Sequence, residues 1–126
     1  MVLRVYNTLT RRLETVRPRH GKKVQMFVCG QTVYDDAHMG HAKTYVQFDV
    51  IVRWLRRIGY DVFYVQNITD LEDKIINRAK EKGVDPLKLA EEHSRRFLED
   101  METLGVKKNV NVFAKTTNYI PQMIEQ

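Results

Sequence analysis

Val24-Gln25-Met26-Phe27-Val28-Cys29 is a short apolar run rich in strand-forming residues, and Gly30 follows it as a turn residue. We expect a buried strand here. From His41 to Ile58, apolar residues recur at helical spacing opposite a charged side, which predicts an amphipathic helix before Gly59. Tyr60 to Gln66 predicts a second strand. This order is typical of a right-handed parallel βαβ unit, so we expect an α/β fold with a Rossmann-like parallel sheet flanked by helices.

The rest of the chain predicts further helices and one irregular segment. Asp85-Pro86 is typical of a helix start, and this helix should run to about Leu104. Another helix should begin near Asp73. The segment from Lys107 to Thr117 has mixed chemistry and predicts a loop or irregular extension, after which residues 118–126 resume an apolar pattern.

Length and composition limit the class of protein. At 126 residues the chain fits a single nucleotide-binding domain covering residues 1–126. Lys and Arg outnumber Asp and Glu by 21 to 16, and this net charge of +5 favours polyanionic partners such as RNA or nucleotide phosphates. The sequence has no membrane-span pattern and no signal-peptide pattern, so we expect a cytoplasmic protein. Cys29 is the only cysteine, which excludes an internal disulfide.

The residues best suited to chemistry lie between the first strand and the helix, in His38-Met39-Gly40-His41. A helix amino terminus offers unpaired N–H groups and partial positive charge, which suits phosphate. Two imidazoles three positions apart lie on one face of the first turn and can donate to the same oxygens. Gly40 lets a base or a phosphate approach the backbone. The alternatives are a capping or surface pair of histidines and a metal-binding pair.

Several segments together resemble the successive signatures of cysteinyl-tRNA synthetases, a family of class I aminoacyl-tRNA synthetases. They are Cys29-Gly30-Gln31-Thr32-Val33-Tyr34-Asp35, His38-Met39-Gly40-His41, Phe48-Asp49 and Asn67-Ile68-Thr69-Asp70-Leu71-Glu72-Asp73-Lys74-Ile75-Ile76. The resemblance covers nearly the whole chain and thins after Leu104. His-x-Gly-His alone is shared with other class I synthetases and nucleotidyltransferases, whereas the cysteine-first segment with Asn-Ile-Thr-Asp is far more specific.

The resemblance implies a ligase that activates cysteine with ATP as cysteinyl-adenylate and then transfers the cysteinyl group to tRNA. It implies that His38 and His41 are the catalytic pair, which contacts the triphosphate of magnesium-bound ATP and stabilises the transition state. Gly40 would pack beneath the adenosine, and Thr32 would be a further ATP-binding residue. This chemistry depends on positioning and charge stabilisation rather than on an enzyme nucleophile.

The resemblance also implies that Cys29 is the first ligand of a zinc ion that binds the thiolate of the substrate cysteine. Zinc prefers thiolate to hydroxyl, which would separate cysteine from serine where shape alone discriminates poorly. Gly30 and Thr69 would help to fix the amino acid. One thiolate cannot hold zinc firmly, so we expect weak or absent zinc in these residues alone. The alternative for Cys29 is a small buried hydrophobe at a strand end.

Relative to that family, the sequence carries only the amino-terminal half of the catalytic domain. The second ATP motif, Lys-Met-Ser-Lys-Ser, does not occur in it, nor do three of the four zinc ligands. We therefore expect the ATP-binding half of a cysteine–tRNA ligase, with catalysis by these residues alone left open. The alternatives are a non-catalytic ATP-binding module, the cysteine ligase of mycothiol synthesis and a small nucleotidyltransferase. A face left bare by the missing half would favour self-association.

Other polar residues are expected to have structural roles. Asp70, Glu72 and Asp73 form an acidic cluster that resembles a metal site, but they favour capping of the helix that begins near Asp73. His20 and His93 have no supporting context in the sequence, and we expect both at the surface.

Overall fold

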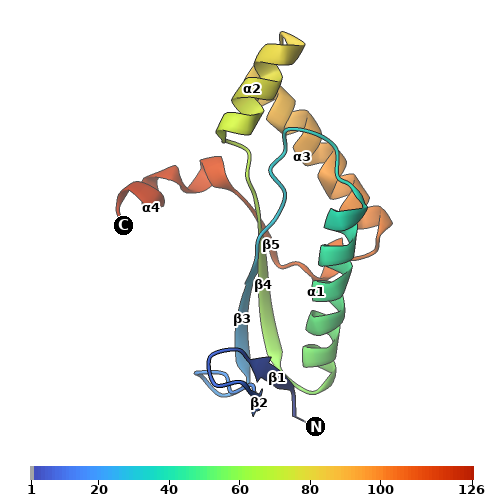
Figure 1. Cartoon of the computed structure of the whole chain (residues 1–126), viewed down its shortest axis with the longest axis vertical. Helices are drawn as coiled ribbons and strands as arrows, with labels where there is room; N and C mark the ends of the chain where they lie inside the picture. Colours follow the sequence, from blue (N-terminus) through green and yellow to red (C-terminus); the bar gives the residue numbers. More distant parts are fainter. Residues whose placement is uncertain (1) are drawn as a thin grey trace.

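The computed structural model describes residues 2–126, in which a three-stranded sheet carries helices on one face (Figure 1). The sheet consists of β3 (Lys23–Val28), β4 (Asp61–Ile68) and β5 (Val112–Lys115), in the order β3-β4-β5. Both neighbouring pairs are parallel, with Val24 opposite Val62 in the first pair. The predictions of an α/β fold and of parallel pairing between the first two strands are confirmed.

The helices lie between the strands in the sequence. The helix between β3 and β4 lies along one face of the sheet, and the two helices between β4 and β5 lie toward and beyond the carboxyl ends of the strands (Figure 1). α1 (Met39–Arg57) joins β3 to β4, and α2 (Asp73–Lys82) and α3 (Pro86–Thr103) lie between β4 and β5. Because side chains alternate along a strand, every second residue of β4 faces these helices and is buried, namely Val62, Tyr64, Gln66 and Ile68.

Local signals fix the helix ends close to the predicted positions. Asp85 caps α3, because its carboxylate accepts a hydrogen bond from the Lys88 N–H at 3.0 Å, and Pro86 occupies the first helical position. α1 ends at Arg57, and Gly59 then has a φ of +91°, a left-handed conformation that favours glycine.

Smaller elements complete the fold. β1 (Arg4–Asn7) and β2 (Arg12–Thr15) form an antiparallel hairpin near the N-terminal end of the chain (Figure 1). Short 3₁₀ turns at Lys107–Asn109 and Thr116–Tyr119 flank β5, and α4 (Ile120–Ile124) follows.

The strand β5 corrects the prediction of an irregular segment from Lys107 to Thr117. Its four residues carry no alternating pattern of their own, and pairing with β4 is what orders them. Asn111 sets this pairing, because its N–H donates to the Tyr64 carbonyl at 2.8 Å and its Oδ1 accepts from the Tyr64 N–H at 2.8 Å. Arg56 of α1 donates to the same Oδ1 at 3.2 Å, which fixes the segment against the helix.

The strand β3 is an edge strand, so the expectation of a buried strand was wrong for most of its length. Within β3 only Val28 is buried, and Phe27 is 64% exposed. The reason is topological, because β4 is the central strand and, within residues 2–126, no helix covers the face that carries Phe27 and Phe63. A short apolar run does not distinguish a central strand from an edge strand.

The loop between β3 and α1 is anchored in the core by Val33, which is fully buried. It belongs to an apolar cluster that joins α1 to α2 and α3. A second apolar cluster lies between α1 and the strands β3 and β4. The main members of the first are Val33, Tyr45, Ile68, Ile75, Phe97 and Met101, and those of the second are Val28, Val52, Leu55, Val62 and Tyr64.

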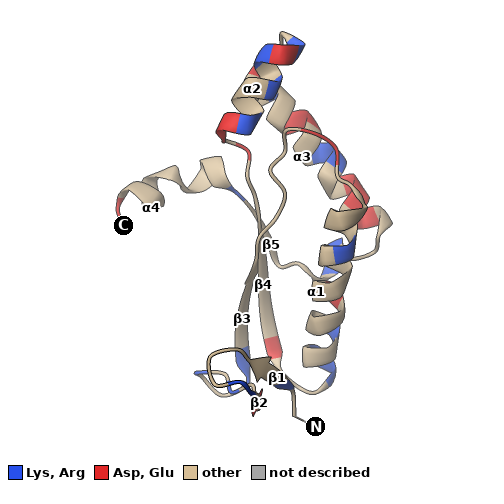
Figure 2. Cartoon of the chain, viewed as in Figure 1, with Lys and Arg blue, Asp and Glu red and all other residues tan. Residues whose placement is uncertain are grey.

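The charged residues differ between the two ends of the molecule. Figure 2 shows Lys and Arg around the β1–β2 hairpin and on the last turns of α1, whereas α2 and α3 carry both signs. In residues 2–126, none of the helices combines the length and the apolar composition needed to cross a bilayer.

Candidate functional site

The start of α1 carries the two predicted histidines in a reciprocal capping arrangement. His38 is the N-cap residue, and its Nδ1 accepts a hydrogen bond from the Gly40 N–H at 3.1 Å. The Nδ1 of His41 accepts from the His38 N–H at 3.3 Å. The two imidazoles thus take the roles that Ser or Thr and Glu or Gln have in a capping box. The capping interpretation is confirmed, and it leaves the second nitrogen of each ring for another partner.

The two imidazole rings stack with their centroids 3.9 Å apart and their planes 20° from parallel. Because the Nδ1 of each ring accepts a hydrogen bond, the neutral form of each ring carries its proton on Nε2. Burial lowers the pKa of His41 below its usual value of 6.5, and the charge of His38 lowers it further. The start of α1 therefore presents Nε2–H donors at the positive end of the helix dipole.

Gly40 makes room for the His38 ring. A Cβ atom at Gly40 would lie 2.9 Å from Cε1 and 3.0 Å from Nδ1 of His38, closer than side chains normally approach. Glycine is therefore needed for the ring to lie over the first turn. The close approach of a nucleotide to this backbone stays a prediction.

Asn67 connects the residues predicted to bind the amino acid. Its Oδ1 accepts a hydrogen bond from the Gly30 N–H at 2.6 Å, and its Nδ2 donates to the Thr69 Oγ1 at 3.1 Å. A Cβ atom at Gly30 would lie only 1.6 Å from the Asn67 carbonyl oxygen, so no other residue fits this backbone. Cys29 is exposed, which contradicts the alternative of a small buried hydrophobe.

Thr32 extends the sheet and brings the two groups of residues together. It forms a parallel bridge with Thr69, and the Val33 N–H donates to the Thr69 carbonyl at 3.1 Å. The predicted ATP-binding and cysteine-binding residues therefore lie at the carboxyl ends of β3 and β4. This is the edge of a parallel sheet at which ligands bind.

Two tyrosine side chains near this site, Tyr45 of α1 and Tyr64 of β4, are buried. Burial, with a smaller contribution from the nearby Cys29, raises the pKa of Tyr45 to about 12. Burial likewise raises the pKa of Tyr64 to about 12, and its hydroxyl donates to the Gln66 Oε1 at 3.3 Å. Both phenols stay protonated at neutral pH, so neither serves as a base.

Comparison with known proteins assigns this arrangement to a family. Residues 15–126 match the family model of the class I (C) tRNA synthetase catalytic domain. The chain belongs to this family. It is 50% identical over 124 residues to a cysteine–tRNA ligase of Thermoplasma acidophilum and 51% identical over 125 residues to that of Pyrococcus horikoshii. These matches cover 98% and 99% of the chain but 27% and 26% of the relatives, so the chain spans about a quarter of their length.

Solved structures agree with this assignment. Methionyl-tRNA synthetase of Mycobacterium tuberculosis, in complex with methionyl-adenylate, matches with a TM-score of 0.72 and 27% identity, over 77% of this chain and 19% of that one. A ternary LeuRS–tRNA–LeuAMS complex from Agrobacterium radiobacter K84 matches with a TM-score of 0.65 over 79% of this chain and 13% of that one. At 20% identity the second match shows the fold alone.

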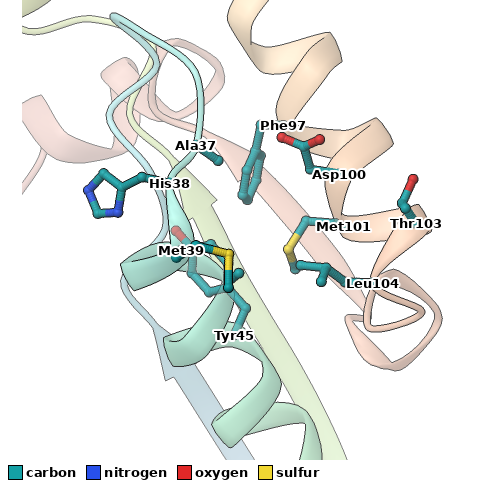
Figure 3. Close-up of a pocket in the computed structure, with 10 residues that line it drawn as sticks. Ala37, His38, Met39, Tyr45, Phe97, Asp100, Met101, Thr103 and Leu104 are labelled. Carbon is teal, nitrogen blue, oxygen red and sulfur yellow. The ribbon is translucent and has the colours of Figure 1, made fainter.

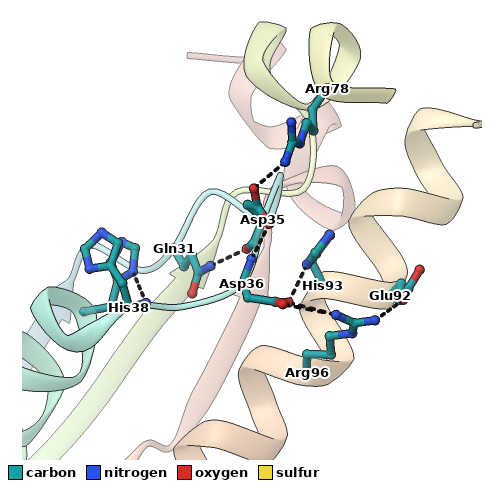
Figure 4. Close-up of polar contacts among 9 residues, drawn as sticks. Gln31, Asp35, Asp36, His38, Arg78, Glu92, His93 and Arg96 are labelled. Atoms are coloured by element: carbon teal, nitrogen blue, oxygen red, sulfur yellow. Dashed lines mark hydrogen bonds and ion pairs between the residues drawn. The ribbon is translucent and has the colours of Figure 1, made fainter. Parts of the chain in front are cut away.

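In this synthetase domain, side chains of α2 and α3 hold the loop that precedes His38 (Figure 4). Arg78 of α2 donates to the Asp35 carboxylate at 2.8 Å, and His93 of α3 lies 3.0 Å from the Asp36 carboxylate. The expectation that His93 is a surface residue was wrong, since it is 4% exposed. It stands four residues after Leu89 and four before Phe97, so the helical periodicity of the buried stripe includes it.

The acidic residues after β4 do not cap α2 through their side chains, which corrects the sequence prediction. Glu72 is the N-cap residue of α2 but makes no capping bond with its carboxylate. Asp70 instead accepts hydrogen bonds from the N–H of Thr117 at 2.9 Å and from its hydroxyl at 2.6 Å. Asp70 therefore ties the end of β4 to the turn after β5. His20 is exposed, as expected.

The residues present do not complete a zinc site. Within residues 2–126, the group of three or more potential metal ligands that lie close together is Asp35, Asp36 and His93, and it does not include Cys29. Arg78 pairs with the first of these carboxylates and Arg96 with the second, so the group is an ion-pair network. Cys29 offers one thiolate, and a structural zinc site needs four ligands.

An apolar pocket of about 460 Å³ lies between the start of α1 and the end of α3 (Figure 3). The His38 ring points away from Phe97 and Met101, so its free nitrogen is not directed at the apolar wall. We assign the pocket no ligand. Its lining residues are Ala37, His38, Met39, Ala42, Tyr45, Phe97, Asp100, Met101, Thr103 and Leu104.

Proposed function

We propose that this chain is the ATP-binding part of a cysteine–tRNA ligase, which activates cysteine as cysteinyl-adenylate and transfers it to tRNA. The observation that carries the proposal is the stacked pair His38 and His41 at the N-terminus of α1. The capping box occupies both Nδ1 atoms and leaves both Nε2 atoms for phosphate oxygens. The family assignment supports the same conclusion.

The start of α1 suits a triphosphate for three reasons that act together. The partial positive charge at the N-terminus of the helix attracts anions. The Nε2–H groups of His38 and His41 add donors that stabilise the charge on the transferring phosphorus, which is their catalytic role. Gly40 lies beneath the adenosine, and Thr32 is a further ATP contact. Magnesium accompanies ATP and neutralises part of the phosphate charge.

The substrate cysteine binds beside Cys29, Gly30 and Thr69 in this proposal. The support is the Asn67 side chain, which fixes Gly30 and Thr69 relative to each other. In the complete enzyme Cys29 is one zinc ligand, and zinc supplies selectivity for a thiolate. The other ligands are not among these residues, so no step of the reaction is assigned to the metal here.

Two further partners, tRNA and a second copy of the chain, are inferred from the charge of the chain and from the sheet face that no helix covers in residues 2–126. The tRNA is expected to contact the basic residues near the β1–β2 hairpin, in a cytoplasmic setting. A second copy of the chain would cover the helix-free face, where Phe27 and Phe63 are 64% and 49% exposed. Sedimentation should then give a mass that rises with concentration, and Phe63→Lys should keep the chain monomeric. A monomer at all concentrations would contradict this association.

The experiment that tests the nucleotide site replaces the imidazoles but keeps the cap. Asn and Gln support a capping box, so His38→Asn with His41→Gln preserves the start of α1 while replacing both imidazole Nε2–H groups with amides. Titration calorimetry should give ATP a dissociation constant on the order of tens of micromolar to millimolar. Because the amides of Asn and Gln can still donate, the double variant should bind several-fold to about thirtyfold more weakly, at up to about 1 kcal/mol for each imidazole donor. His20→Ala is the control and should bind normally.

An exchange assay on the same chain, read together with ATP binding, discriminates between the rival functions. Cysteine-dependent exchange of labelled pyrophosphate into ATP indicates adenylation, whereas ATP binding without exchange indicates a non-catalytic module. Exchange that leads to cysteine transfer to an amino-sugar rather than to tRNA indicates the mycothiol ligase, although the relatives named cysteine–tRNA ligase favour the synthetase. Unchanged ATP binding in the double variant would place the nucleotide elsewhere and refute the proposal.

A further inference from the structure

Asp36 connects the loop before His38 to helix α3. Its Oδ1 lies 3.0 Å from the His93 Nδ1, and its two oxygens each accept from the Arg96 Nη1 at 3.1 Å (Figure 4). Asp36 stands two residues before His38, the N-cap of α1. A movement of the Asp36 backbone would therefore move the first imidazole of the site.

The partners of Asp36 on α3 are themselves held in place. His93 is 4% exposed on the buried stripe of α3, so its ring has little freedom to rotate. Because a carboxylate only accepts hydrogen bonds, the His93 Nδ1 must carry the proton that Asp36 accepts. The Arg96 Nη2 donates to Glu92 one turn earlier at 2.5 Å, which fixes the guanidinium at the helix surface.

A second tether holds the same loop from α2. The Asp35 carboxylate accepts from the Arg78 Nη2 at 2.8 Å and from the Asp36 N–H at 3.0 Å. The Gln31 Nε2 donates to the Asp35 carbonyl at 2.8 Å from inside the loop. The two carboxylates thus tie adjacent residues to two different helices, and together they restrict both the position and the rotation of the segment before His38.

We propose that Asp36 is a positioning residue for the nucleotide site, which sets the orientation of His38 through its contacts with His93 and Arg96. The proposal rests on the assignment of His38 and His41 to ATP binding. Partial burial by itself raises the pKa of Asp36, but hydrogen bonds from Arg96 and His93 outweigh it and lower the pKa below the usual range. The carboxylate is therefore ionised at neutral pH, as the contacts require.

The role is one of local order rather than of global stability. Asp36 is 56% exposed, and ion pairs between exposed groups contribute little to the free energy of unfolding. Removal of the carboxylate should therefore lower the stability of the folded state only modestly, mainly because the His93 Nδ1–H loses its acceptor. It should nevertheless loosen the loop, because it frees the segment from α3 and leaves Asp35 as its remaining side-chain tether to the helices among the described contacts.

The test compares Asp36→Ala with a matched control on α3. Glu99→Ala removes a similarly exposed carboxylate, 2.6 Å from Arg95, that does not touch the loop. The two amides to follow by hydrogen exchange are those of His41 and Ala42, which donate to the His38 carbonyl. Asp36→Ala should speed their exchange and weaken ATP binding by about three- to tenfold. Glu99→Ala should change neither and should unfold at the temperature of the unmodified chain, and Asp36→Ala should unfold only slightly lower, because the His93 Nδ1–H loses its acceptor.

Two further variants link the effect to the proposed contacts. Arg96→Ala should give a smaller effect in the same direction, and combining it with Asp36→Ala should add little, because the two changes remove the same contact. Asp36→Asn keeps an acceptor for His93 and should recover part of the ATP affinity. An Asp36→Ala chain with normal exchange at His41 and Ala42, or with normal ATP affinity while His38→Asn with His41→Gln binds weakly, would overturn the proposal.

The exchange measurement separates this proposal from the assignment of the ATP site. If His38→Asn with His41→Gln leaves ATP binding unchanged, the assignment of the nucleotide site has failed. In that case faster exchange at His41 and Ala42 in Asp36→Ala supports the positioning of the histidines, and unchanged exchange refutes it.

Discussion

The His38 and His41 rings stack 3.9 Å apart, and each accepts a backbone hydrogen bond through Nδ1. A ring that accepts at Nδ1 is neutral and protonated at Nε2. Protonation of His41 would convert this acceptor into a donor and break its bond to the His38 N–H. The capping box and the charge state of His41 are therefore coupled.

This coupling predicts how the histidines titrate. In long-range ¹H–¹⁵N spectra at neutral pH, both rings should show the Nε2–H tautomer, and the midpoint of His41 should lie below 6.5 because burial lowers its pKa. A pKa that is lower in the folded state means that the unfolded chain binds the proton more tightly. The contribution of His41 to the free energy of unfolding is therefore fully present above about pH 6.5, and it is lost as the pH falls through the pKa of the folded state. A midpoint of His41 at or above 6.5 would contradict the arrangement.

Gly30 should tolerate no side chain. In Gly30→Ala the Cβ atom would lie 1.6 Å from the Asn67 carbonyl oxygen, so the end of β3 and the end of β4 would have to separate. We expect a loss on the order of 3 kcal/mol or more in the free energy of unfolding, measured by urea denaturation. Gly21→Ala is the control, since it has a φ of +56° but open space around it, and should cost about 1 to 2 kcal/mol. Equal costs for the two variants would show that β3 and β4 separate easily at this end.

The elements that the sequence predicted best are those determined by local chemistry. α1 has an apolar stripe and a glycine after it, and α3 begins with Asp85-Pro86, so both could be placed within about two residues of their observed ends. The strand β5 could not be predicted, because its order comes from pairing with β4 and from Asn111, nearly fifty residues away from its partner Tyr64 in the sequence.

The candidate site divides in the same way. The histidine pair was predictable because both residues lie within one helical turn. The support of the site was not, because Asp36 meets its partners on α3 across 57 and 60 residues of chain. His93 could have been recognised from its place in the apolar stripe of α3. Asn67 belongs to the Asn-Ile-Thr-Asp motif, but its two hydrogen bonds depend on the parallel register of β3 and β4.

Cys29 should be reactive and should not hold zinc firmly in this chain. Its thiol is exposed, and no cluster of potential ligands within residues 2–126 includes it. Elemental analysis after desalting should give less than one zinc per chain, and Ellman's reagent should modify one thiol quickly without denaturant. Cys29→Ser should change the free energy of unfolding by no more than about 0.5 kcal/mol. Stoichiometric zinc would mean that nearby histidines complete a metal site, contrary to their assignment to phosphate.

Asn67 should matter more than its partial burial suggests, because one amide holds two backbone segments. Asn67→Ala removes the bonds to the Gly30 N–H and to the Thr69 hydroxyl, and at about 1 kcal/mol for each it should cost about 2 kcal/mol in the free energy of unfolding. Thr69→Val keeps the shape of the side chain but removes one of the two bonds, so it should cost about half as much. Asn118→Ala, at an exposed position, is the control and should cost almost nothing.

The effects of Asn67→Ala and Thr69→Val on the free energy of unfolding should not be additive. In Asn67→Ala with Thr69→Val the bond between the side chains is lost only once, so the double variant should be about 1 kcal/mol more stable than the sum of the single changes predicts. Urea denaturation of the four chains gives this coupling directly. Cysteine titrations followed by NMR should lose their shifts at Gly30 in Asn67→Ala but retain them in the Asn118→Ala control. Additive unfolding energies, or normal cysteine shifts in Asn67→Ala, would mean that Asn67 does not organise the amino-acid side of the site.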